Sequence, residues 1–218
     1  MIYAARIEDI KGSTIYQNME QILPDEIISH IRLLSNEGPR TERACAYLLL
    51  AKALKKEGIE IRDLTFELKE NRKPRIVNED MPDFNLSHSG EYVVCMISEE
   101  PCGCDVEMIS RKMTSIVRRY YTEEEKKAVI KCRDGNETEP NQALAMSIWT
   151  MKESFIKPIG LGLSVPLESF CSIERLPKIR QNIAEGDYYV KTFAINDEYV
   201  CAFCQKNKEI EWELCYPE

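Results

Sequence analysis

Apolar and polar residues follow two different periods along this chain, and each period predicts one kind of element. In residues 24–34 the apolar positions recur every three or four residues, which predicts a helix with one buried stripe. A second helix is predicted over residues 41–56, with Thr41 as its N-cap and Gly58 just beyond its end. Arg43 would then lie in the first turn of that helix.

Strand-like and helix-like segments continue through the rest of the chain. Residues 92–97, 104–108 and 170–204 alternate or are rich in β-branched and aromatic residues, which predicts strands. The Thr-x-x-Glu pattern at 122–125 is a capping box that opens a helix, and residues 141–157 have a long helical period. The chain is therefore predicted to have a mixed α+β fold.

The length of 218 residues allows one domain or two small lobes. No repeat or low-complexity linker divides the chain, so a lobe boundary near Gly103 is not sharply marked in the sequence. We therefore expect an N-terminal lobe at 1–102 and a C-terminal lobe at 103–218. A chain of this size can bury a core by itself, so we expect a monomer.

The charge balance limits the classes of partner. The chain has 29 Lys and Arg against 37 Asp and Glu, a net charge of −8 that argues against bulk nucleic-acid binding. No apolar run approaches the roughly 18 residues of a membrane span. The first ten residues, MIYAARIEDI, lack the apolar core of a secretory signal, so we expect a cytoplasmic protein.

Nine cysteines raise the question of disulfides or metal ligands. A cytoplasmic location favours reduced thiols. Cys201 and Cys204 form a CxxC within a predicted strand, where residues three apart face opposite sides. We interpret the cysteines mostly as small core residues.

Two acids at 103–107 (GCDVE) are the first candidates for chemistry. On a strand, Asp105 and Glu107 project from one face about 7 Å apart, while the residues between and beside them pack on the other. Oxygen ligands of this kind favour Mg²⁺ or Mn²⁺ over zinc. The alternative is a half-exposed edge strand with solvated acids.

The predicted helix at 141–157 has two faces of different composition. We expect Pro158 to end this helix. One face is a core stripe of Leu144, Ile148, Met151 and Phe155. The other groups Trp149, Glu153, Ile156 and Lys157, a partly apolar surface suited to line a cleft. Glu153 and Lys157 could also form an ordinary helix ion pair worth about 0.3 to 0.5 kcal/mol.

Anion-binding candidates come from three further places. Residues 85–90 (NLSHSG) place Ser87 and His88 at what we interpret as a tight turn, with backbone N–H groups near its glycine. Arg43 on the second predicted helix and Lys73 in a basic turn could also bind an anion. Each of these could equally be an ordinary structural or solvated side chain.

Three of these segments together resemble a family. The blocks FNLSHSG, GCDVE and WTMKESFIKPIGLGLS, in this order and spacing, are similar to the signature blocks of the 4′-phosphopantetheinyl transferases, in the larger Sfp-type branch. The resemblance is firm over residues 83–167. It implies an α+β fold of two similar lobes related by a pseudo-twofold axis, with coenzyme A and a metal ion held between them.

The resemblance also implies an activity. Enzymes of this family transfer the phosphopantetheine arm of coenzyme A to a serine of an apo acyl or peptidyl carrier protein and release adenosine 3′,5′-bisphosphate. The implied metal ligands are Asp105, Glu107 and Glu153, with Mg²⁺ as the expected ion and Mn²⁺ as an alternative. Lys157 matches the lysine at the reacting phosphate. The implied coenzyme A contacts are Arg43, Lys73, Ser87 and His88.

The physical chemistry agrees with this assignment, since phosphoryl transfer depends on positioning and charge neutralisation. Glu153 or a metal-bound water is the candidate base for the carrier serine, and Lys157 would stabilise or protonate the leaving phosphate. The segment at 113–121 (MTSIVRRYY) has the composition of a carrier docking surface or of core. Residues 24–32 contain acids and His30 where the family often has basic residues.

Two other functions are compatible with the same residues. One is a different Mg²⁺-dependent phosphotransferase or hydrolase that acts on a small nucleotide with the same acids. The other is a non-catalytic module that binds carrier protein or coenzyme A. The three acids together with Lys157 favour catalysis, because a binding module does not need a metal set.

Overall fold

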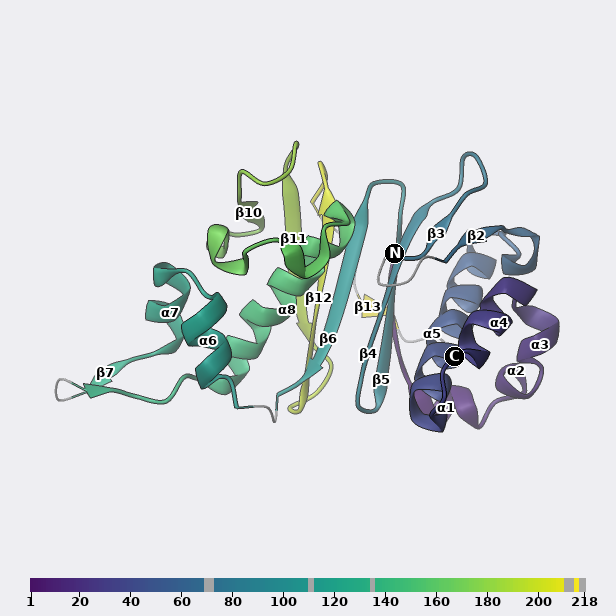
Figure 1. Cartoon of the computed structure of the whole chain (residues 1–218), viewed down its shortest axis with the longest axis horizontal. Helices are drawn as coiled ribbons and strands as arrows, with labels where there is room; N and C mark the ends of the chain where they lie inside the picture. Colours follow the sequence, from purple (N-terminus) through teal and green to yellow (C-terminus); the bar gives the residue numbers. More distant parts are fainter. Residues whose placement is uncertain (69–72, 110–111, 134–135, 210–213, 216–218) are drawn as a thin grey trace.

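The computed structural model describes residues 1–68, 73–109, 112–133, 136–209 and 214–215. Two units, each with a mainly antiparallel sheet and one long helix, lie side by side (Figure 1). Within the described residues, no helix is both long and apolar enough to cross a membrane. The predicted α+β class is confirmed.

The first unit is a sheet in the order β13-β1-β5-β4, covered on one face by helices. Its strands are β1 (Ile2–Arg6), β4 (Asp83–Ser89), β5 (Tyr92–Ser98) and β13 (Leu214–Cys215). Its helices are α1 (Ile7–Lys11), α2 (Thr14–Gln17), α3 (Met19–Ile22), α4 (Asp25–Arg32), α5 (Glu37–Lys56) and the 3-10 turn η1 (Ile61–Asp63). A small ribbon pairs β2 (Phe66–Glu67) with β3 (Arg75–Ile76).

The second unit is a sheet in the order β6-β12-β11-β10-β9. Its strands are β6 (Cys102–Met108), β9 (Cys171–Arg175), β10 (Lys178–Arg180), β11 (Tyr188–Ala194) and β12 (Tyr199–Lys206). Its helices are α6 (Thr114–Tyr120), α7 (Glu123–Val129), α8 (Gln142–Ile159), η2 (Gly162–Ser164) and η3 (Leu167–Ser169). A short ribbon joins β7 (Cys132–Arg133) to β8 (Asn136–Glu137).

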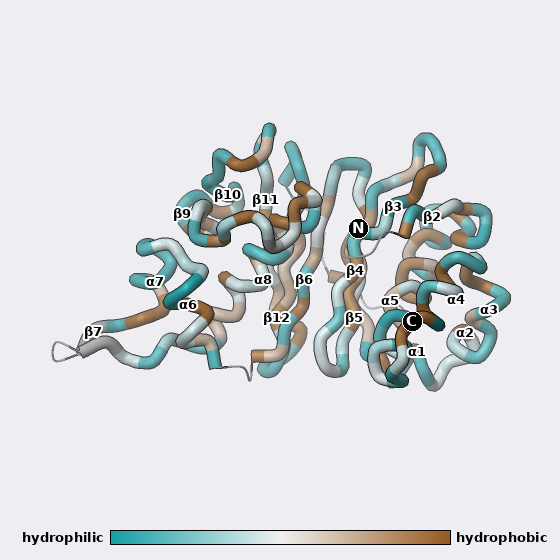
Figure 2. Tube along the Cα trace, viewed as in Figure 1, coloured by the Kyte–Doolittle hydropathy of each residue, from teal (hydrophilic) through white to brown (hydrophobic). Residues whose placement is uncertain are grey.

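Three apolar clusters form the core, and Figure 2 shows hydrophobic residues concentrated along the inner strands and helices. The first lies between α5 and the first sheet, and the second between α8 and the second sheet. The third lies between the two sheets, where alternate residues of β1 and β5 meet those of β6 and β12. The order of layers is therefore helices, sheet, sheet, helices.

The division at residues 102 and 103 stays a prediction, and one strand crosses it. Strand β13, close to the C-terminus, pairs in parallel with β1 and so adds to the first sheet. The two sheets approach most closely where β4 and β6, the edge strands of their sheets, run in the same direction beside each other.

The second predicted helix begins earlier than expected. Helix α5 starts at Glu37 with Asn36 as N-cap, so Arg43 lies in the second turn and the first-turn prediction was wrong. Pro39 is compatible with this earlier start, because as the third helical residue it sits where backbone N–H groups have no helical partner. The predicted C-terminal stop is confirmed, since Gly58 has a φ of +76°.

Helix α8 also differs from its prediction at both ends. Pro158 lies inside the helix, which ends at Ile159 before the left-handed Gly160, so the expected stop at Pro158 was wrong. In the core stripe Ile148, Met151 and Phe155 are buried, but Leu144 is 38% exposed. Its neighbour Ala145 is buried in its place, in the same apolar cluster as Val117 of α6 and Val129 of α7.

The cysteine interpretation is supported where the structure describes the side chains. Seven of these cysteines are buried free thiols. Cys201 packs between the two sheets, while Cys204 packs under α8, so the CxxC residues do face opposite sides of β12. Burial raises the pKa of the Cys104 thiol to about 12, which makes a metal-binding thiolate unfavourable there.

Candidate active site

Side chains of β4 hold the two sheets together where their edge strands meet. Every second residue of β4 points toward β6, and the first two of these accept backbone N–H bonds. Asp83 Oδ2 accepts from the Cys102 amide at 2.7 Å, and Asn85 Oδ1 accepts from the Cys104 amide at 2.8 Å. Carboxylate and amide side chains thus take the place of a backbone ladder in this half of the junction.

The next two residues of the same row bond to acids rather than to the backbone. Ser87 Oγ donates to Asp105 Oδ1 at 3.0 Å, and Ser89 Oγ donates to Glu107 Oε2 at 3.1 Å. Asp105 and Glu107 lie on β6 on the face opposite Cys104 and Val106, as their alternation predicted. The far half of the junction is therefore a row of hydroxyl and carboxylate groups.

Helix α8 lies unusually close to β6 because the strand has a glycine at the crossing. A Cβ atom at Gly103 would overlap the Ser154 carbonyl oxygen and lie 2.5 Å from Cδ of Pro158. Pro158 has no N–H, so the Ser154 carbonyl has no helical donor four residues on. The close approach brings Lys157 Nζ to 2.6 Å from the Cys104 carbonyl oxygen.

Lys157 and Asp105 form an ion pair across this contact. Lys157 Nζ lies 2.8 Å from Asp105 Oδ1, and the two side chains are 24% and 9% exposed. Burial is the largest influence and works against the charged lysine, but the charge and hydrogen bond of Asp105 and the charge of Glu153 act together with other neighbours to raise the pKa of Lys157. The second oxygen of Asp105, Oδ2, is buried and has no hydrogen-bond partner. An unsatisfied carboxylate oxygen beside a cation is typical of a reactive or ligand-binding position.

Glu153, one turn before Lys157, has a strongly altered acidity. Desolvation raises its pKa to about 7, and the negative charges of Asp105 and Glu107 add to this, while Lys157 opposes it. A carboxyl group with a pKa near neutrality can accept and return a proton at physiological pH. The acids of β6 and α8 therefore act on one another electrostatically.

The first lobe contributes imidazole and guanidinium groups to the same rim. His88 Nδ1 lies 3.3 Å from Glu42 Oε2 of α5, and the His88 side chain is 41% exposed. Partial desolvation lowers the pKa of His88, while Glu42 counteracts this. Arg43 Nη1 lies 2.9 Å from His30 Nε2, and because a guanidinium only donates, that ring nitrogen is the acceptor.

The segment at 85–90 is a strand where we expected a turn. Ser87 and His88 are inside β4, and the turn is formed only by Gly90 and Glu91. Consecutive strand residues point to opposite sides, so Ser87 faces β6 and His88 faces α5. The expected backbone anion site near Gly90 is weakened, because the Glu91 amide already donates to Tyr199 Oη at 3.1 Å.

Lys73 lies apart from the other predicted residues. Its ammonium pairs with Asp83 and donates to the Cys102 carbonyl at 2.7 Å, so it binds at the opposite end of the β4–β6 junction from Ser89. Only 10% of its side chain is exposed. The preceding residue of the basic turn, Arg72, lies outside the described residues.

The structure thus brings six of the eight predicted residues to the far half of the junction, with Arg43 beside them on α5 and Lys73 at the other end. The sequence reasoning missed Asp83, Asn85 and Ser89 as partners of β6. Their signal was present, because polar residues occupy every second position from 83 to 89. Glu42 was missed because nothing local links it to His88.

The same side chains are the candidates for metal binding. Among the residues that the structure describes, no group of three or more His, Cys, Asp or Glu side chains is arranged to hold a metal ion. The donor types nevertheless suit a hard divalent cation, and Asp105 Oδ2 is a buried oxygen without a partner. The residues therefore fit such an ion in chemistry, while Lys157 and Ser87 occupy Asp105 Oδ1.

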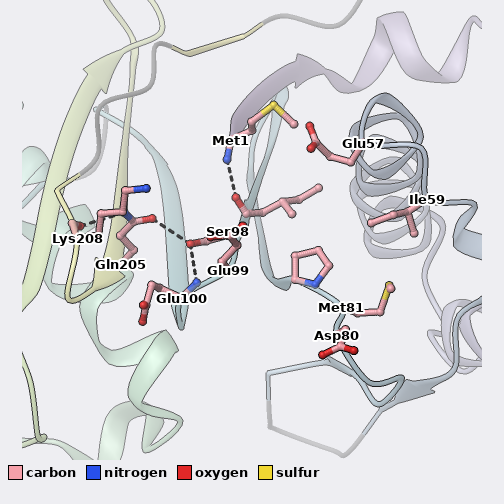
Figure 3. Close-up of a pocket in the computed structure, with 12 residues that line it drawn as sticks. Met1, Glu57, Ile59, Asp80, Met81, Ser98, Glu99, Glu100, Gln205 and Lys208 are labelled. Carbon is pink, nitrogen blue, oxygen red and sulfur yellow. Dashed lines mark hydrogen bonds between the residues drawn. The ribbon is translucent and has the colours of Figure 1, made fainter.

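A separate pocket of about 640 Å³ lies elsewhere between the sheets (Figure 3). Figure 3 shows acidic side chains and the Met1 amine around it, with Ser98 bonded to Gln205 on one side. None of the eight predicted site residues lines it. The size of a pocket therefore does not identify the reactive site in this protein.

The fold and the site define an α+β enzyme in which two lobes share a rim of acids, a lysine and a histidine, an arrangement suited to phosphoryl-group chemistry. Residues 101–204 match the 4′-phosphopantetheinyl transferase superfamily. This segment includes Asp105, Glu107, Glu153 and Lys157. The predicted residues of the first lobe lie outside it.

Relatives extend the likeness over most of the chain. The chain is 34% identical to the 4′-phosphopantetheinyl transferase Sfp of Bacillus subtilis (strain 168), over 70% of this chain and 67% of that protein. It is 26% identical to the 4′-phosphopantetheinyl transferase psf-1 of Bacillus pumilus, over 94% of this chain and 89% of that protein. The chain belongs to the 4′-phosphopantetheinyl transferase family, and the predicted enzyme class is confirmed.

Proposed function

We propose that this transferase uses Asp105, Glu107 and Glu153 to bind Mg²⁺, or alternatively Mn²⁺, while it moves phosphopantetheine from coenzyme A to a carrier-protein serine. The observation that carries this proposal is the state of Asp105. Its carboxylate is almost fully buried, one oxygen is bonded by Lys157 and Ser87, and the other has no partner. A cation on the free oxygen would satisfy it.

When bound, a divalent cation supplies charge neutralisation for the pyrophosphate and its leaving group. The chain supplies the remaining functions. Asp105 and Glu107 are held in place by Ser87 and Ser89, and Glu153 approaches from α8. Ser89 orients the Glu107 carboxylate through its bond to Oε2.

The reaction forms one bond and breaks one. The serine oxygen of the carrier bonds to the phosphorus that carries the pantetheine arm, and the bond from that phosphorus to the oxygen of the adenosine 3′,5′-bisphosphate leaving group breaks. Glu153, which approaches from α8, is the proposed base that takes the serine proton. Lys157 keeps its charge beside Asp105 and stabilises the leaving phosphate.

The nucleotide part of coenzyme A would bind along the rim toward α5. His88 and Arg43 offer a ring nitrogen and a guanidinium for a phosphate, and Ser87 offers a hydroxyl. Because Glu42 pairs with His88 Nδ1, the other ring nitrogen is the one that we assign to the phosphate. Lys73 remains a predicted contact to the adenine end, although Asp83 already engages its ammonium.

A carrier docking surface on α6 is the remaining part of the proposal. Met113, Val117 and Tyr121 are core residues, so only part of the apolar surface expected from that segment is exposed, at Ile116 and Tyr120. The exposed side of α6 instead has Arg118 and Arg119. Carrier proteins are usually acidic, and a basic docking surface would attract them despite the net charge of −8.

We further propose that the enzyme acts as a monomer in the cytoplasm, without nucleic acid or membrane as partner. The layers of the fold support this, because each lobe buries its own core and the third cluster joins them.

The decisive experiment incubates the protein with Mg²⁺, coenzyme A and apo acyl or peptidyl carrier proteins and measures carrier mass. We expect a gain of one phosphopantetheine on the carrier and release of adenosine 3′,5′-bisphosphate. Unchanged carriers, together with coenzyme A hydrolysis in their absence, would contradict the proposal and favour a hydrolase.

A further inference from the structure

A second lysine–carboxylate pair lies deep in the C-terminal lobe, and the proposed chemistry does not use it. Lys152 of α8 and Glu125 of α7 are both 0% exposed, with Lys152 Nζ 2.8 Å from Glu125 Oε2. The same ammonium donates to the carbonyl oxygens of Leu167 and Phe170, each at 2.8 Å. All three of its N–H donors therefore have an acceptor.

The Glu125 carboxylate is equally well satisfied. Its Oε1 accepts from both the amide and the hydroxyl of Ser172, each at 2.9 Å. Its Oε2 accepts from the Thr122 amide at 2.9 Å as part of the capping box that opens α7. The pair therefore connects α7, α8, the turn η3 and strand β9 through directional bonds.

Directional bonds matter here because the rest of the α8 contact is apolar. Hydrophobic burial is non-directional and resists a small slide or rotation of a helix only weakly. One residue of helical displacement equals about 1.5 Å along the axis and about 100° of rotation. Lys152 is the residue directly before Glu153, and Lys157 lies five residues further on, so the anchor and the site share one rigid helix.

We propose that Lys152 and Glu125 are positioning residues for the transfer reaction, since they hold α8 at the rotation and height at which Glu153 and Lys157 meet Asp105. The inference rests on the proposed roles of Glu153 and Lys157. A buried ion pair often adds little net stability compared with apolar residues, and it is better suited to specify one arrangement. A misplacement of about 1 Å at a reacting group can reduce a rate about 100-fold.

The test variant is Lys152→Met combined with Glu125→Gln. Methionine keeps the length of the lysine stem, and glutamine keeps an acceptor for Ser172 without leaving an unpaired charge. We expect kcat for carrier modification to fall about 10- to 100-fold, in line with the effect of small misplacements. The affinity for coenzyme A, measured by calorimetry, should change little, because His88 and Arg43 lie in the other lobe.

The matched control is Met146→Ala, a buried apolar residue of the same helix and core. It should lower the melting temperature at least as much as the double variant and keep kcat within a few-fold of the wild type. An equal fall of kcat in both variants would show a merely structural role and overturn the inference. Wild-type kcat in the folded double variant would overturn it as well.

A milder variant covers the case in which the double variant does not fold. Ser172→Ala removes only the hydroxyl bond to Glu125 Oε1 and should lower kcat a few-fold with unchanged coenzyme A affinity. Wild-type kcat in this variant would contradict the inference. Amide hydrogen exchange in the last two turns of α8 is measured without the transfer reaction. It therefore distinguishes an error in the positioning role of Lys152 and Glu125 from an error in the roles assigned to Glu153 and Lys157. We expect faster exchange there in Ser172→Ala than in Met146→Ala.

Discussion

Helix α8 has two lysine–carboxylate pairs only five residues apart, and they differ in how completely they are satisfied. Both N–O distances are 2.8 Å. Lys152 and Glu125 are fully buried, and every hydrogen-bonding atom in the pair has a protein partner. Lys157 and Asp105 are partly open, and Asp105 Oδ2 has no partner. Completeness of hydrogen bonding, more than charge or distance, separates the structural pair from the reactive one.

Electrostatics reinforces the same contrast. Desolvation lowers the pKa of Lys152, although Glu125 opposes the shift. At Lys157 burial also disfavours the charged form, but Asp105 and the other neighbouring groups together raise the pKa. The lysine at the site thus stays charged over a wider pH range than the lysine of the anchor. Four predictions test this comparison.

The largest effect is expected at Asp105. Asp105→Asn removes the anionic oxygen without a partner, and we expect transfer to fall by about 10³-fold or more, as for loss of a central electrostatic group. The melting temperature should stay within a few degrees of the wild type, because amide atoms can still bond to Ser87. Carrier mass spectrometry and thermal unfolding measure the two quantities. The matched control is Asp197→Asn in the exposed turn before β12, which should transfer at the wild-type rate. An active Asp105→Asn enzyme would contradict the assignment of Asp105 as a metal ligand.

The second prediction compares how much each pair contributes to the free energy of unfolding. Lys152→Met alone leaves Glu125 buried and unpaired, which should reduce the free energy of unfolding by about 3–5 kcal/mol. Lys157→Met should reduce it less, since Asp105 keeps its bond to Ser87 and is nearer to water. Urea unfolding of both variants measures the difference. Equal losses in the two variants would remove the distinction between anchor and site.

The third prediction concerns Glu153 in the metal-free protein. Its pKa is raised from 4.5 to about 7, so the fold favours the protonated form, and stability is lost as pH rises between these values. Glu153→Gln imitates the protonated form. It should raise the melting temperature in EDTA at about pH 8 and change it little at about pH 4.5. A difference that does not depend on pH would show that the Glu153 carboxyl is not perturbed.

The smallest effect is expected at Ser89. Ser89→Ala removes one hydrogen bond to Glu107, which should cost about 0.5–1.5 kcal/mol of stability and a few-fold in transfer rate. Ser35→Ala in the exposed bend before α5 is a control for loss of a hydroxyl. A loss of transfer as large as that of Asp105→Asn would mean that Ser89 has a direct part in the reaction.

Much of α8 could be predicted because its signals are local. The helical period identified the buried positions Ile148 and Phe155, and the spacing of Glu153 and Lys157 placed both at the cleft. The prediction for Pro158 was wrong because the cost of proline depends on its neighbours, and here Gly103 of β6 leaves room for the Ser154 carbonyl and the proline ring. The prediction for Leu144 was wrong because the helical period fits it as well as its neighbour, and only the tertiary packing places Ala145 in the core.

Pairings between distant segments could not be predicted in the same way. Ser87 reads locally as part of a turn before Gly90, yet its partner Asp105 lies 18 residues away on the other sheet. Lys152 belongs to a segment that the resemblance covers, but its burial depends on Glu125 and on the return of the chain at Phe170. A residue pattern predicts which face a side chain occupies, and only the packing of elements shows what it meets there.

The central claim, that the incompletely satisfied pair is the reactive one, is tested most directly at Lys157. Transfer of phosphopantetheine to an apo carrier is measured by mass spectrometry under single-turnover conditions for the wild type and Lys157→Met, with urea unfolding of both proteins. We expect Lys157→Met to fold and its transfer rate to fall about 10²–10³-fold, as for loss of a group that stabilises developing charge. A folded Lys157→Met enzyme with the wild-type rate would contradict it.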